Sequence, residues 1–169
     1  MWVFNRKPPY TLRMSETRKL PAGKIVGVQT SFYTIMNPEK YDPTAIPNSW
    51  QAFFGKYHSS DLPKMNVFYG AVIPNNDINS PMTYVAGILV TNSVEIPDGM
   101  TAIDFPEGEY FCVTHKGPVT ELATSYPKAY MEEFPKVGRE MRNAPHLEIY
   151  ESDKDPMDSE YEMVIGIPV

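Results

Sequence analysis

The chain has 169 residues, a formal net charge of −6, and contents of 42% hydrophobic and 21% charged residues. This composition is typical of a globular protein, and such a length can bury roughly two thirds of the unfolded chain's surface. No run of Lys and Arg forms the basic stripe of a nucleic-acid-binding domain, and no apolar run approaches the ~20 residues that cross a bilayer. We therefore expect one domain over residues 1–169, with no direct nucleic-acid or membrane partner.

Cysteine and histidine usage points away from disulfides and metal sites. The single cysteine, Cys112, excludes an internal disulfide, and the first residues lack the apolar core of a signal peptide; a cytoplasmic protein is expected. The three histidines share no metal-site spacing with Cys112, so neither a metal nor another cofactor is expected. Cys112 and His115 lie three positions apart in a predicted strand, so their side chains should point to opposite faces.

Proline and aromatic residues are unusually frequent. The chain has 17 Pro, and its aromatic residues are 11 Tyr, 8 Phe and 2 Trp. Many prolines indicate fixed turns and short elements. Tyrosine combines a large apolar face with a polar tip, so a Tyr-rich chain can line a pocket as well as a core.

The first half predicts strands around one helix. Residues 11–16 are weakly strand-like, residues 20–23 favour a type I turn, and residues 24–33 are β-prone. A loop with three prolines (37–47) then precedes a helix whose start is expected at Pro47, Asn48 or Ser49. This helix carries an aromatic face at i, i+3, i+4 and i+7, formed by Trp50, Phe53, Phe54 and Tyr57. Two further strands, 67–73 and 82–90, predict a hairpin.

The second half repeats this order. Residues 101–105 and 109–115 predict strands on either side of a turn at 106–108. After Gly117 and Pro118 a helix carries an aromatic stripe at every fourth position, made by Leu122, Tyr126, Tyr130 and Phe134. Pro127 is expected to kink this helix or restart it, with Ser125 as a possible cap, and 135–138 to end it. Strands follow at 147–150 and 161–169, with a polar loop at 151–160 between them.

The two halves align as an internal repeat. The matched segments are 21–23 with 106–108, 50–54 with 130–134, 67–69 with 148–150, and 84–90 with 163–169. The alignment makes Trp50 equivalent to Tyr130, and Tyr69 to Tyr150. We therefore predict an α+β fold of two pseudo-twofold-related strand–helix–strand–strand modules, about 10–92 and 98–169. Their antiparallel sheet and two main helices would leave a central groove.

These residues resemble the GyrI-like small-molecule-binding family, also called the bacterial transcription-activator effector-binding domain, from about residue 10 to the C-terminus. The matching positions are Pro47, Trp50 and Phe53 in the first half, and Pro106, Gly108, Tyr110, His115, Gly117, Pro118, Leu122, Tyr126, Tyr130, Pro135, Glu148, Tyr150 and 167–169 in the second. The resemblance implies a pocket at the pseudo-twofold axis that binds lipophilic, often cationic compounds. It leaves no room for the DNA-binding helices of some relatives, so a stand-alone domain is expected. Pro127 and the 37–47 loop depart from the family pattern, which puts the rim of the pocket in doubt.

Glu148 is the central candidate for ligand binding. Judged from the residues alone, an outward orientation is favoured, because Glu is rarely buried; the resemblance implies an inward one. Tyr150 lies two positions away and shares its strand face, while Trp50 and Tyr130 fit a core position or a pocket wall. The candidate set is completed by Tyr69, which is matched to Tyr150, and by residues that fit a core position better than a ligand contact: Tyr84, Phe54, Tyr126 and Met163.

Three functions stay open at this point. The first is binding of lipophilic, cationic or aromatic small molecules, which needs only the pocket and Glu148. The second is a hydrolase in which Glu148 activates water as a general base, as the resemblance implies for relatives that act on reactive toxins. The third, also from the resemblance, is a gyrase-inhibitor-like role with a protein partner, or contact with a transcription regulator.

Overall fold

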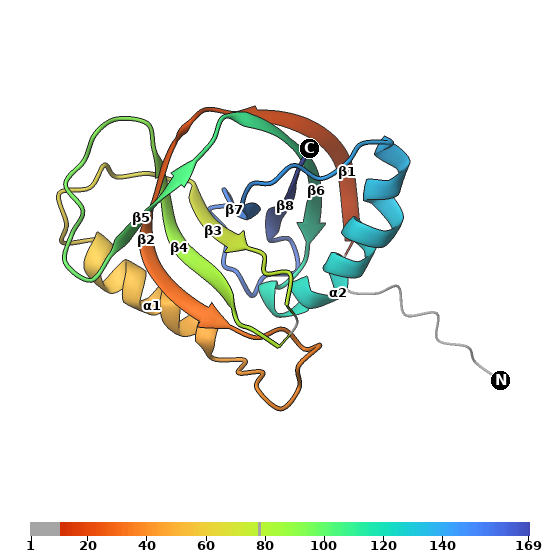
Figure 1. Cartoon of the computed structure of the whole chain (residues 1–169), viewed down its shortest axis with the longest axis horizontal. Coiled ribbons are helices and arrows are strands. Elements are labelled where there is room, and N and C mark those ends of the chain that lie inside the picture. Colours follow the sequence, from red (N-terminus) through yellow and green to blue (C-terminus); the bar gives the residue numbers. More distant parts are fainter. Residues whose placement is uncertain (1–10, 78) are drawn as a thin grey trace.

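The protein is an α+β structure built on one antiparallel sheet. The computed structural model describes residues 11–77 and 79–169, and within these ranges eight strands pair in the order β1-β6-β8-β7-β3-β4-β2-β5. Two helical segments lie at opposite sides of this curled sheet (Figure 1). The elements are β1 (Thr11–Leu20), β2 (Gly23–Phe32), α1 (Ala45–Tyr57), β3 (Phe68–Ile73), β4 (Met82–Val90), β5 (Thr101–Phe105), β6 (Gly108–Lys116), η1 (Val119–Glu121), α2 (Leu122–Pro127), η2 (Lys128–Glu133), η3 (Phe134–Val137), β7 (His146–Tyr150) and β8 (Glu162–Pro168).

The strand order has the symmetry that the repeat predicts. Reading the sheet from either edge gives the same succession, with β1 matched to β5, β6 to β2, β8 to β4 and β7 to β3. The central pair is β3 with β7, in which Gly70 lies opposite Glu148. The predicted α+β fold of two related modules is therefore confirmed, and the modules meet at β3 and β7.

Each module places its first strand in the sheet of the other. β1 pairs with β6 and β5 pairs with β2, while β1 and β2 are joined through Pro21 and Ala22 without pairing to each other. The predicted turn at 20–23 is thus a point where the chain crosses from one half-sheet to the other. Figure 1 shows the result as two long curved bands, β1 with β2 and β5 with β6.

The sheet buries apolar side chains on both faces. One core cluster gathers Ile25, Val85, Tyr110, Leu147 and neighbouring side chains from both half-sheets, without a contribution from either helical segment. On the other face, α1 covers a cluster from β2 and β4, and the segment 119–137 covers one from β6 and β8. Because successive side chains of a strand alternate between faces, a strand buried on both reads as a continuous apolar run, as β8 does.

Helix α1 starts earlier than the sequence suggested. It begins at Ala45, not at 47–49. The helix can include Pro47 because this residue lies in the first turn, where the missing N–H of proline removes no helical hydrogen bond. Ser49 is not a cap: its hydroxyl donates to the Ile46 carbonyl at 2.6 Å.

The second helical segment passes Pro127 without a break. α2 ends at Pro127 and continues directly as the π-helical η2 and the 3-10 turn η3, until Gly138 takes a left-handed φ of 68°. Ser125 does not cap a new helix; it is fully buried and bonded to His115. The expected kink is therefore replaced by a change of helical pitch.

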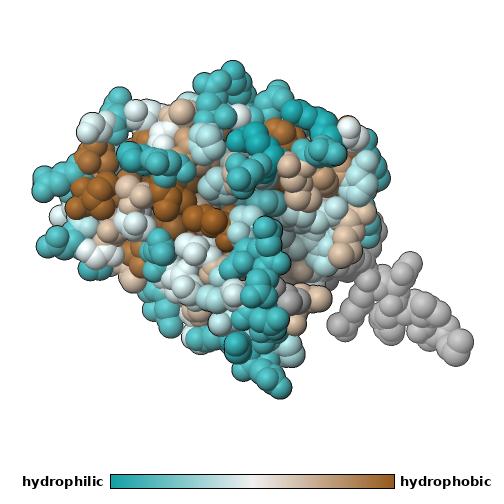
Figure 2. Space-filling model, in the orientation of Figure 1, coloured by the Kyte–Doolittle hydropathy of each residue, from teal (hydrophilic) through white to brown (hydrophobic). Residues whose placement is uncertain are grey.

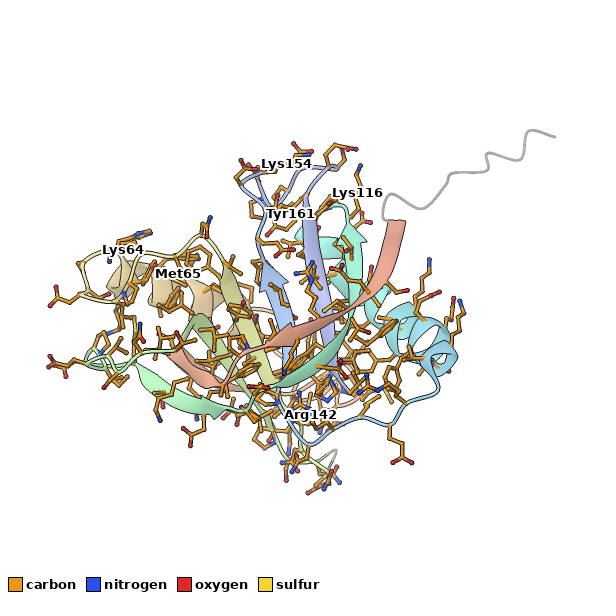
Figure 3. The ribbon with its side chains drawn as sticks, turned by 90° about the horizontal axis from the view of Figure 1, so that it is seen from above. Lys64, Met65, Lys116, Arg142, Lys154 and Tyr161 are labelled. Atoms are coloured by element: carbon orange, nitrogen blue, oxygen red, sulfur yellow. The ribbon has the colours of Figure 1, made fainter. Side chains whose placement is uncertain are left out.

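The face of the molecule in Figure 2 is mostly hydrophilic. On the face in Figure 2, apolar side chains gather toward the side of the molecule that holds α1 and β5. In Figure 3, Lys154 and Tyr161 mark the polar connection between β7 and β8, and Lys64 and Met65 mark the loop after α1. In the part of the chain that the structure describes, no helix has the length and apolarity required for crossing a membrane.

Candidate ligand-binding site

Glu148 lies at the centre of the sheet with only 6% of its surface exposed. Its carboxylate accepts hydrogen bonds from three tyrosine hydroxyls: Tyr84 at 2.6 Å and Tyr150 at 2.8 Å on Oε2, and Tyr126 on Oε1. The donors come from β4, β7 and α2. Among the described residues, no lysine or arginine forms an ion pair with this carboxylate. A nearly buried anion is thus held by neutral donors.

Gly70 makes room for this arrangement. It pairs with Glu148 across the β3–β7 ladder, so the two residues share a face of the sheet. A Cβ atom at Gly70 would lie 2.0 Å from the Tyr84 hydroxyl and 2.8 Å from Glu148 Oε2. Because Gly70 has no side chain, the Glu148 carboxylate and the Tyr84 phenol can meet at the pseudo-twofold axis.

Helix α1 supplies one aromatic wall. The Trp50 indole donates from Nε1 to the Tyr84 hydroxyl at 2.9 Å. Its ring meets Tyr150 edge-on, with centroids 5.2 Å apart, and stacks on Phe54 at 5.7 Å. The aromatic face predicted for this helix therefore reaches the tyrosines that surround Glu148.

The helical segment of the second module supplies the opposite wall. Tyr126 and Tyr130 stack with centroids 6.1 Å apart, and Tyr130 stacks in turn on His146 of β7 at 5.7 Å. The Tyr130 hydroxyl and His146 Nδ1 are 2.5 Å apart. The carboxylate thus has aromatic rings on both sides, one set from α1 and one from α2 and η2.

Burial keeps the surrounding phenols protonated. It raises the pKa of Tyr84, Tyr126 and Tyr150 well above the ordinary value of 10.0, and the charge of Glu148 raises each pKa further. Burial and then the Glu148 charge also raise the pKa of Tyr130. The hydroxyls are therefore available as donors to the carboxylate across the physiological pH range.

The structure brings most of the candidate residues together, but not all. Glu148, Tyr84, Tyr126, Tyr150 and Trp50 are linked by hydrogen bonds, with Phe54 and Tyr130 stacked on the outer members.

Two candidates lie elsewhere. Tyr69 pairs with Ile149 and packs against the core cluster that contains Ile25 and Leu147, on the sheet face away from Glu148. Met163 is fully buried among the side chains beneath the second helical segment.

The expected equivalence of Tyr69 and Tyr150 is wrong, and the strand register shows why. If β4 and β8 align as predicted, Ala86 matches Ile165; Ala86 pairs with Gly70 and Ile165 pairs with Glu148. Gly70 is therefore the counterpart of Glu148, three positions away from the alignment read from the sequence. The sequence alignment is shifted by three residues, an odd number, so it matches residues that lie on opposite faces of the sheet.

Two residues of this site escaped the sequence analysis. Gly70 could have been found by requiring equivalent strands to keep the same face. His146, at the start of β7, carried a signal in its spacing, because it lies two positions before Glu148 and so shares its face.

A two-module sheet with a carboxylate and an aromatic wall from each helix at the module boundary is an α+β arrangement suited to holding a small molecule. The chain belongs to the family described as the GyrI-like small molecule binding domain, whose model matches residues 14–169. The chain is 27% identical over 128 residues to the transcriptional regulator BrlR of Pseudomonas aeruginosa, a match that covers 73% of this chain and 46% of the regulator. The chain thus spans about half the length of that relative.

Two solved structures have the same fold. One is described as SAV2435 bound to tetraphenylphosphonium, with a TM-score of 0.66, 18% identity, and coverage of 93% of this chain and 94% of the other. The second is described as a hydrolase from Listeria innocua, with a TM-score of 0.53, 16% identity, and coverage of 92% and 91%. At these identities the likeness establishes the fold and nothing finer.

Proposed function

We propose that this protein binds lipophilic cations or planar aromatic cations between α1 and the α2–η2 segment, with Glu148 as the counter-charge. The observation that carries the proposal is the Glu148 carboxylate, 6% exposed and bonded to three tyrosine hydroxyls. The described residues give this carboxylate no paired cation; an unpaired buried anion is costly, and a cationic ligand would supply the opposite charge. The aromatic faces of Trp50 and Tyr130 suit such a ligand, because a cation is attracted to the face of an aromatic ring.

Family membership and a ligand-bound neighbour support the same conclusion. The family model is that of a small-molecule-binding domain, and the structure described as SAV2435 was bound to tetraphenylphosphonium, a lipophilic cation. As the biological role we propose drug sensing or sequestration in the cytoplasm, without direct contact to nucleic acid.

The test is a titration of tryptophan fluorescence with tetraphenylphosphonium. Wild-type protein should show saturable quenching, and Glu148→Gln should weaken binding by about 2 kcal/mol or more, or roughly thirtyfold in Kd, because the counter-charge is lost. Glu132→Gln is the matched control: it removes the same charge from an exposed position on η2 and should leave Kd within about twofold, since exposed charges are screened.

The anion tetraphenylborate, which has the same shape, separates charge from hydrophobicity. It should bind wild type more weakly than the phosphonium does. Equal affinity of wild type and Glu148→Gln for the phosphonium would overturn the proposal, as would equal affinity of wild type for the two ions.

A hydrolase is the second candidate, because one carboxylate oxygen is less occupied than the other. Oε2 accepts two hydroxyls, whereas Oε1 accepts only that of Tyr126 among the described residues, so Oε1 retains the capacity to accept a hydrogen bond from water, as general-base catalysis requires. Turnover of a bound reactive electrophile by wild type, lost in Glu148→Gln, would support it. A gyrase-like or regulator partner would depend on the surface and stays a prediction.

A further inference from the structure

His146 and Tyr130 form a hydrogen-bonded, stacked pair beside Glu148. The Tyr130 hydroxyl lies 2.5 Å from His146 Nδ1, and the two rings are 5.7 Å apart with an interplanar angle of 16°. Tyr130 stacks on Tyr126 in the same way, at 6.1 Å and 26°, and the Tyr126 hydroxyl donates to Glu148. His146, Tyr130 and Tyr126 thus form a continuous stack of three rings that ends at the carboxylate.

His146 lies within electrostatic reach of the carboxylate. The two residues are two positions apart on β7, so they share a face and their Cα atoms are about 7 Å apart. Among the described residues, the titratable groups around His146 are Tyr130 from η2, which contacts it, Tyr126 from α2, which stacks on Tyr130, and Glu148 from its own strand. Its partner on β3 is the uncharged Val72.

Protonation of His146 would change this pair in two ways. A neutral imidazole accepts the Tyr130 hydroxyl at Nδ1, whereas an imidazolium has only donors. The Tyr130 hydroxyl would then have to accept from Nδ1–H and turn its own hydrogen away. A positive charge would also appear beside Glu148, where it would compete with a bound cation.

We propose that His146 is a positioning residue for Tyr130 in the ligand site, and that its protonation weakens the binding of cationic ligands. This inference rests on the proposed function of the site around Glu148. Burial lowers the pKa of His146 below the ordinary value of 6.5, so the imidazole is neutral at pH 7 and the binding-competent state prevails there. The protein would thus hold a cation at neutral pH and release it in acid.

The test measures the Kd of tetraphenylphosphonium at pH 7.5 and pH 5.0, with circular dichroism confirming the fold at both. This cation carries a permanent charge and does not titrate. Linked sites typically change each other's affinity about 5- to 150-fold when both are fully occupied, so wild type should bind more weakly at pH 5.0, by a factor that grows with the protonated fraction of His146. In His146→Gln, which keeps hydrogen-bonding atoms but does not titrate, this pH dependence should fall to less than about twofold.

Titration of a group other than His146 is the competing cause, and the variants distinguish it. A loss of affinity in acid that persists in His146→Gln would assign the effect to a group other than His146 and overturn the inference. His58→Gln is the matched control: it removes the exposed histidine stacked on Phe54 at 5.7 Å and should keep the wild-type pH dependence.

Linkage provides a second measurement, the pKa of His146 with and without ligand, which would not change if His146 had only a structural role. If protonation weakens cation binding, then cation binding must lower the pKa of His146 by the same coupling, which NMR of the imidazole protons measures directly. Binding at pH 7.5 with an unchanged His146 pKa would refute the inference while leaving the proposed function intact. No binding at either pH would overturn both.

Discussion

Glu148 is buried, and its hydrogen-bond partners are neutral phenol hydroxyls rather than cations. Hydrogen bonds to a charged group contribute about 1.5–3 kcal/mol each, so three of them offset much of the cost of burying a carboxylate. They do not neutralise it. Under the proposed function, the side chain is therefore stable in the free protein and keeps a charge with which to attract a cation.

Gly70→Ala should disturb this network at its tightest point. The new Cβ would meet the Tyr84 hydroxyl at 2.0 Å and its Cζ at 2.6 Å, and Tyr84 is fully buried and has no space to retreat. We expect a loss of about 1–3 kcal/mol in the free energy of unfolding, measured by urea titration, together with weaker tetraphenylphosphonium binding.

Gly55→Ala is the control for this glycine substitution. A Cβ at Gly55 would have nothing within 4 Å, and the residue lies inside α1, so alanine should stabilise the protein by about 0.5–1 kcal/mol. A Gly70→Ala protein as stable as wild type would show that the carboxylate and Tyr84 have more room than the structure gives them.

The buried tyrosines predict a loss of stability in alkali. Their pKa values are raised in the folded state, so their stabilising contribution is complete below the unfolded value of about 10 and is lost as the pH rises through the folded values. Each group changes the free energy of unfolding by up to about 1.4 kcal/mol per pH unit. Urea midpoints between pH 8 and 11 should fall less steeply in Tyr150→Phe than in wild type; the same slope in both would contradict the assignment.

At the scale of elements, His115 ties the second helical segment to β6. Both side chains of the pair are fully buried: Ser125 Oγ lies 2.7 Å from His115 Nδ1, while Nε2 lies 3.2 Å from the Pro118 carbonyl. Because a carbonyl can only accept, Nε2 is the donor, and in the neutral imidazole Nδ1 then accepts the serine hydroxyl. The helix start and the strand end are thereby held by one imidazole.

Ser125→Ala should loosen this connection. It leaves a buried imidazole nitrogen without its partner, which costs about 1–3 kcal/mol, and the effect is read from thermal or urea unfolding. Thr124→Ala, one residue earlier, removes an exposed hydroxyl bonded to the Glu121 carbonyl and should stay within about 0.5 kcal/mol of wild type. Equal effects of the two substitutions would argue against a special role for the His115–Ser125 pair.

The elements themselves could largely be read from the sequence, since alternation and helical spacing mark each strand and helix. Pro127 could not, because local rules predict a kink and do not anticipate that π-helical η2 absorbs it. The predicted equivalence of Tyr69 and Tyr150 was wrong for another reason. A match of three residues cannot determine which face of the sheet each side chain occupies, whereas the pairing of Gly70 with Ala86 does. Glu148 was found through the family pattern rather than through its chemistry.

At the scale of the whole molecule, the exchange of β1 and β5 makes the two modules one folding unit. Each half-sheet contains a strand that the other half of the sequence supplies. We therefore expect unfolding to be two-state, with coincident urea transitions from tryptophan fluorescence, which includes Trp50 of the first module, and from far-ultraviolet circular dichroism, which reports both. Separate midpoints would contradict this prediction.

The same exchange bears on how the chain folds as it is made. Thr11 pairs with Lys116, so β1 must remain without its partner until the ribosome has added more than 100 further residues. Contacts between such distant positions slow folding, because the intervening chain must be ordered before they form. During synthesis at about 5–20 residues per second, the strand stays unpaired for several seconds, a period in which it is open to proteases, chaperones and neighbouring nascent chains.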